Sequence, residues 1–159
     1  MSQDHIVKLL EESIEQELGT AALYRLFSEL YPHDAAFWSQ LQLEEKSHAT
    51  LLRVALNSYE KRGILPERIL SASIEGLVQT NAKLAHLLDR CKTTPPDRRS
   101  AFEIAMSMES ETGEKHYNVF MEKDPESPIE EVFQQLNRED KHHEIRIRDY
   151  FENLLAEES

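Results

Sequence analysis

The chain has 159 residues, a length typical of one compact domain, and 40% of its residues are apolar. The 30 acidic residues outnumber the 18 basic ones and give a net charge of -12, which disfavours binding to nucleic acids or to an anionic membrane surface. The single cysteine, Cys91, excludes an internal disulfide and a paired-cysteine metal or redox motif. Since no apolar run approaches the ~20 residues of a membrane-spanning helix, we expect a soluble cytoplasmic protein, with residues 1–159 forming one domain.

Prolines divide the chain into five stretches with helical periodicity. A proline inside a helix costs ~3 kcal/mol, so helices are expected between the prolines. The predicted helices are residues 3–31, 34–62, about 71–91, 97–122 and 128–157. No stretch shows the sustained alternation with period two that is typical of a strand. The sequence therefore predicts an all-α fold.

Several helix ends carry recognisable capping signals. Asp34 and Thr94 are candidate N-caps of the second and fourth helices, and Ser127 with Pro128 begins the fifth. Gly63 is a candidate stop for the second helix, because glycine readily adopts the left-handed conformation that ends helices.

The lengths of the five helices suggest a bundle. Four of them are long, and the shorter third helix lies in the connection between the second and the fourth. A plain up-and-down bundle needs only a short loop at that point. We therefore expect a four-helix bundle whose crossover connection carries an extra helix, with the ferritin-like topology among the alternatives.

The apolar stripes of the first and fourth helices are each interrupted by a glutamate. Glu17 follows Ile14 on the inward line of the first helix, and Glu109 follows Met106 on that of the fourth. Lone carboxylates are rarely buried without a partner, because their desolvation costs several kcal/mol. Glu111 competes with Glu109, but the two lie ~200° apart around a helix and cannot both face inward. The apolar line favours Glu109.

The second and fifth helices each carry a Glu-x-x-His motif, which places a carboxylate and an imidazole on one helix face. The pairs are Glu45 with His48 and Glu139 with His142. In the fifth helix Asp140 and His143 have the same spacing, and His143 continues an inward line through Ile147 and Tyr150.

The two halves of the chain thus repeat a single-glutamate helix followed by a Glu-x-x-His helix. Four glutamates and two histidines would meet inside the bundle, and their charge of -4 would be balanced by two divalent metal ions. Without metal, clustered carboxylates must be partly protonated or repel one another. Oxygen and imidazole ligands without thiolate favour iron or manganese, with zinc as an alternative.

The sequence resembles the rubrerythrin-like branch of the ferritin-like superfamily, whose bundles hold two metal ions in such a ligand set. The matching segments are IEQELGTAALY, EEKSHA, AFEIAMSMESETGEKHY and REDKHHE. The last segment favours Glu139 and His142 over Asp140 and His143. The resemblance implies six metal ligands, which are Glu17, Glu45, His48, Glu109, Glu139 and His142. Tyr24 is a candidate for the layer behind the ligands, as a core aromatic residue, a redox participant or both.

The resemblance implies a non-haem di-iron oxidoreductase that reacts with peroxide or O₂. Peroxide reduction is the leading activity, and ferroxidase chemistry is close behind. Full rubrerythrins carry a rubredoxin-like module that needs paired CxxC motifs, and one cysteine cannot supply it. Electrons must therefore come from an external donor or from the substrate. The alternative is a metal-binding or redox-sensing bundle without significant turnover. Association into a homodimer is expected from related bundles.

Overall fold

The computed structural model describes residues 3–63, 74–112 and 128–158. They form the helices α1 (Gln3–Leu30), α2 (Ala35–Arg62), α3 (Ile74–Thr93), α4 (Arg98–Thr112) and α6 (Pro128–Glu158), with a short 3₁₀ turn, η1 (Pro32–Asp34), before α2. No strand occurs in these three ranges, so the prediction of an all-α fold is confirmed for the described chain. Residues 113–122 of the predicted fourth helix lie outside the described residues.

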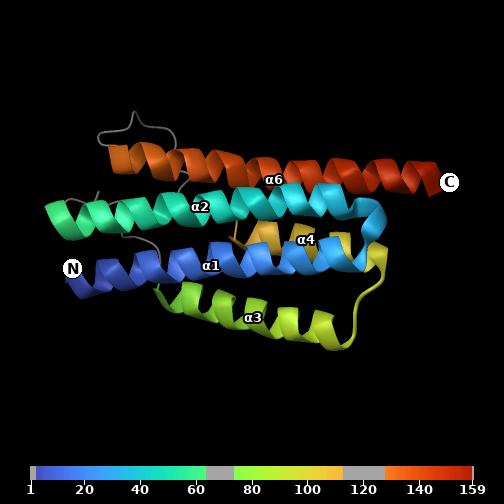
Figure 1. Ribbon diagram of the computed structural model, residues 1–159, viewed down its shortest axis with the longest axis horizontal. Coiled ribbons are helices and arrows are strands. Elements are labelled where there is room, and N and C mark those ends of the chain that lie inside the picture. The colour runs from blue at the N-terminus through green and yellow to red at the C-terminus, as the bar shows by residue number, and fades with distance from the viewer. Residues whose placement is uncertain (1–2, 64–73, 113–127, 159) are drawn as a thin grey trace.

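The helices lie side by side with nearly parallel axes (Figure 1). α1 and α2 are antiparallel neighbours, α6 lies against α2, and α3 lies against the opposite side of α1. α3 follows α2 in the chain and leads to the end of the molecule at which α4 begins. α4 consequently runs in the direction of α2 and opposite to α6, against which it packs.

Two clusters of buried apolar side chains hold the helices together. The smaller cluster joins α1 to α2 and contains Ile6, Leu10, Ile14, Ala49, Leu52, Ala55 and Tyr59. The larger cluster joins all five helices and contains Leu23, Tyr24, Phe27, Trp38, Leu41, Leu84, Cys91, Ala101, Phe102, Ala105, Met108 and Ile147. Along α1 the smaller cluster ends at Ile14 and the larger begins at Leu23. The segment between them is where the polar interior lies.

Helix ends follow the expected signals in part. Gly63 has φ 66° and its N–H bonds to the carbonyl of Tyr59, so the predicted stop of α2 is confirmed. Thr94 is not the cap of α4, because the carboxylate of Asp97 accepts the N–H of Ser100 at 2.7 Å and caps the helix instead. Ser127 lies outside the described residues.

Asp34 occupies the N-cap position of α2, but its side chain does not cap the helix. The buried carboxylate accepts two hydrogen bonds from the guanidinium of Arg98, at 2.6 and 2.7 Å, and one from the hydroxyl of Tyr150, at 2.9 Å. These hydrogen bonds join the start of α2 to α4 and α6. The charged partner thus replaces the predicted cap interaction.

Gly19 explains how α3 approaches α1. A Cβ atom at this position would lie 2.7 Å from the Cδ2 of Leu84, which is buried on α3. The missing side chain therefore makes room for that leucine. None of the described helices is both long and apolar enough to cross a membrane.

Candidate metal centre

A layer of polar side chains lies between the two apolar clusters. Glu45 and His48 of α2, Glu109 of α4 and His143 of α6 are each at most 2% exposed. Glu17 of α1 joins them with a side chain that is 16% exposed. Each of the five residues lies on a helix that also carries buried apolar residues of one or both clusters. The packing of those apolar residues brings the five polar side chains together. A buried layer of this kind needs partners for its charges.

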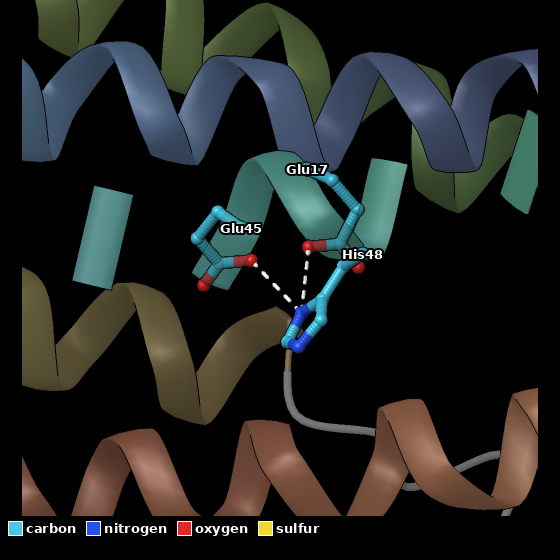
Figure 2. A group of neighbouring side chains, drawn as sticks. All are labelled: Glu17, Glu45 and His48. Carbon is cyan, nitrogen blue, oxygen red and sulfur yellow. Dashed lines mark ion pairs between the residues drawn. The ribbon is translucent and has the colours of Figure 1, made fainter. Parts of the chain in front are cut away.

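The first group of this layer consists of Glu17, Glu45 and His48 (Figure 2). The Nδ1 atom of His48 lies 3.3 Å from Oε2 of Glu45 and 3.7 Å from Oε2 of Glu17. The three side chains come from two helices and point toward one another, and each offers one ligand atom within 4.8 Å of the others. This arrangement could hold a metal ion.

The second group consists of Glu45, Glu109 and His143, all of them buried. The Nδ1 atom of His143 lies 3.0 Å from Oε1 of Glu45 and 3.7 Å from Oε1 of Glu109. Glu45 therefore belongs to both groups, with one carboxylate oxygen directed at each histidine. The rings of His48 and His143 stack with centroids 5.3 Å apart. The two groups are thus halves of one compact site.

The fifth predicted helix turns a different histidine inward from the one that the sequence favoured. His142 is exposed, whereas His143 is 1% exposed and lies in the second group. Ile147, one turn further along α6, is fully buried, which confirms the inward line through His143. The preference for His142 was therefore wrong. The side chains of Glu139 and Asp140 lie outside the described residues.

Tyr24 lies directly behind the second group. Its ring is fully buried in the larger apolar cluster, and its hydroxyl donates a hydrogen bond to Oε1 of Glu109. Tyr24 is therefore placed next to Glu109, within the buried core. This hydrogen bond fixes the orientation of the Glu109 carboxylate.

The cluster changes the protonation of its members. Burial disfavours the charged form of His143, but the contacts with Glu109 and Glu45 outweigh it and raise the pKa of His143 to about 10. Burial and the neighbouring charge of Glu45 raise the pKa of Glu17 well above its usual range, although His48 opposes this shift. At neutral pH the imidazole of His143 therefore keeps its proton.

The residues fit a metal ion in a second respect. Oε2 of Glu45 is buried and has no hydrogen-bond partner among the described residues. Leaving such an atom unpaired costs about 1–3 kcal/mol, and more for a charged group. A cation between Glu45 and His48 would satisfy it. The donor set, of carboxylates and imidazoles without thiolate, suits iron, manganese or zinc.

Two residues beside the site were missed from the sequence. Glu44 lies 3.4 Å from the Nε2 atom of His143, measured from its Oε2 atom, and Arg146 binds both oxygens of Glu44. A signal was present for Arg146, since it follows His143 by three residues and thus lies on the same face of the helix. Glu44 had no such signal, because an acidic residue beside Glu45 looks like an ordinary solvent-facing charge.

Comparison of the chain with protein-family models, with curated proteins and with solved structures gave no match.

Proposed function

We propose that this chain is a ferritin-like bundle that holds two iron ions and reacts with peroxide or O₂. The observation that carries the proposal is the buried polar layer, in which two carboxylate–histidine groups share Glu45. Four helices contribute to this layer, and apolar clusters enclose it on both sides. The direction of the helices, with α3 in the connection between α2 and α4, supports the ferritin-like topology (Figure 1).

Each ligand residue has a distinct task in this proposal. Glu45 would hold both ions, Glu17 and His48 would complete the ligand set of the first, and Glu109 and His143 would complete that of the second. Tyr24 orients Glu109, and the surrounding apolar side chains exclude bulk water. Ferrous iron bound at this site would supply the two electrons that reduce the oxidant, one from each ion. Glu139 and Asp140, which precede His143 by four and three residues, are the candidates for a further carboxylate.

The proposed reaction is tested by rapid mixing. The protein is loaded with Fe²⁺ in the absence of O₂ and is then mixed with an oxidant. The ferrous protein is mixed with hydrogen peroxide or with O₂, and the appearance of ferric absorption is followed. We expect oxidation well above the rate of free Fe²⁺ in the same buffer, faster with peroxide than with O₂. A faster reaction with O₂ favours the ferroxidase activity instead. Oxidation no faster than that of free Fe²⁺ contradicts the enzyme and leaves a metal-binding bundle without turnover.

Metal binding is expected to release protons. A metal ion on Nδ1 of His143 must displace a proton, because a pKa of about 10 keeps that imidazole protonated at pH 7. Loading at pH 7 should therefore release at least one proton per chain, and the affinity should rise with pH. Calorimetric titration with Zn²⁺ in two buffers of different ionisation enthalpy measures this number. The His142→Ala variant serves as the control and should release as many protons, while loading without proton release would contradict the assignment.

The same shift sets the pH dependence of the metal-free protein. Since the pKa of His143 is raised on folding, its ion pairs contribute full stability below the ordinary pKa of about 6.5. That contribution is lost as the pH rises toward about 10. Chemical unfolding of the metal-free chain across this range should show the decline.

A further inference from the structure

The second ring nitrogen of His143 has a partner of its own outside the two groups. While Nδ1 faces Glu45 and Glu109, Nε2 lies 3.4 Å from Oε2 of Glu44. Glu44 belongs to neither group, and its side chain is 32% exposed. The imidazole is thus held between the buried carboxylates on one side and a half-buried carboxylate on the other.

Glu44 is itself fixed by a cation from the helix that carries His143. One guanidinium nitrogen of Arg146, Nη1, donates to both carboxylate oxygens of Glu44, at 2.9 and 2.8 Å. The arginine comes from α6 and the glutamate from α2. The two side chains therefore join these helices at the level of the polar layer.

A half-buried ion pair that water still reaches contributes little to stability by itself. The place of Glu44 against Nε2 suggests a different role, because a histidine that binds metal usually donates its other ring N–H to a carboxylate. That hydrogen bond selects the tautomer and the orientation of the ring.

We infer that Glu44 is a positioning residue of the proposed metal centre: held by Arg146, it accepts the Nε2–H of His143 and thereby directs Nδ1 at the metal. This inference rests on the proposed function. Glu44 touches neither substrate nor metal in this role. Its effect passes through the imidazole alone and is confined to the half of the site that contains Glu109.

The test compares Co²⁺ binding to the full chain and to its variants Glu44→Ala, Glu44→Gln and Arg146→Ala. In Glu44→Ala we expect one of the two Co²⁺ sites to lose about 10–100-fold in affinity while the other keeps its affinity, with a changed visible absorption spectrum of the bound cobalt. Glu44→Gln should restore most of the affinity, since its amide oxygen still accepts the N–H. Arg146→Ala leaves the carboxylate in place and should cause a smaller loss.

The matched control is Glu144→Gln on the same helix. It breaks the ion pair in which Oε1 of Glu144 lies 2.9 Å from Nη2 of Arg148. It should leave affinity and spectrum unchanged.

Wild-type affinity and spectrum in Glu44→Ala would overturn the inference while the metal centre stands, even if the metal-free variant is less stable. If the unaltered chain binds no Co²⁺, the proposed function fails and the inference with it. Should Glu44→Ala not fold, Glu44→Gln and Arg146→Ala decide by the same readouts.

Discussion

Replacing Glu45 by alanine is expected to remove metal binding from both groups of the centre. Its two carboxylate oxygens lie 3.3 Å from Nδ1 of His48 and 3.0 Å from Nδ1 of His143, so each group depends on this one side chain. Without it, each group retains a single carboxylate and a single imidazole among the described residues. Iron content after anaerobic loading should fall from about two per chain to nearly none.

Three further variants make this result specific. Glu17→Ala and Glu109→Ala each remove a residue of one group only, and each should retain about one metal ion per chain. Glu60→Ala removes an exposed glutamate from the same helix as Glu45 and should retain both. Two metal ions in Glu45→Ala would show that the groups do not share this carboxylate.

Replacing Asp34 by asparagine is expected to lower the free energy of unfolding by about 2–3 kcal/mol at neutral pH. The Asp34 side chain is fully buried and accepts charged hydrogen bonds from Arg98, so its neutral substitute loses the ion pair that joins α2 to α4. The loss is smaller than for a fully buried pair, because the Arg98 side chain is 37% exposed and water can solvate its charge. Urea unfolding measures the difference.

The effect of this substitution should depend on pH. Burial works against ionisation of Asp34, but the hydrogen bonds from Arg98 and Tyr150 outweigh it and lower the pKa of the carboxyl group. A lowered pKa contributes stability above the ordinary value of about 4, and this contribution is lost as the pH falls through the folded-state pKa. The two proteins should therefore converge in strong acid. Asp149→Asn, an exposed change next to Tyr150, should have little effect at any pH; an equal loss there would contradict the argument.

Four members of the polar layer could be identified from the sequence because each breaks an apolar stripe. Glu17 interrupts a line of core residues on α1, and Glu109 does the same on α4. Glu45 and His48 occupy inward positions between Leu41 and Leu52, both of which are buried. Helical periodicity is a local property, so it identifies these positions without knowledge of the partner helices. Whether the four bind a metal ion is a separate question that periodicity does not answer.

The remaining features depend on contacts between helices. His142 and His143 are neighbours in sequence, and only the packing of α6 against α2 and α4 decides which one is buried. The family motif favours His142, which is exposed. The apolar line through Ile147 indicates His143, which is buried. The local sequence around Asp34 indicates a helix cap. Its actual partner is Arg98, which lies 64 residues later in the sequence. Local patterns do not contain such long-range partners.

The number of metal ions per chain tests the account most directly. Protein purified without chelators is loaded with Fe²⁺ under anaerobic conditions, freed of excess metal and subjected to elemental analysis, with circular dichroism to show that it is folded. The account predicts about two iron ions per chain, bound without cysteine ligands. A well-folded chain that retains no metal after this treatment would contradict it.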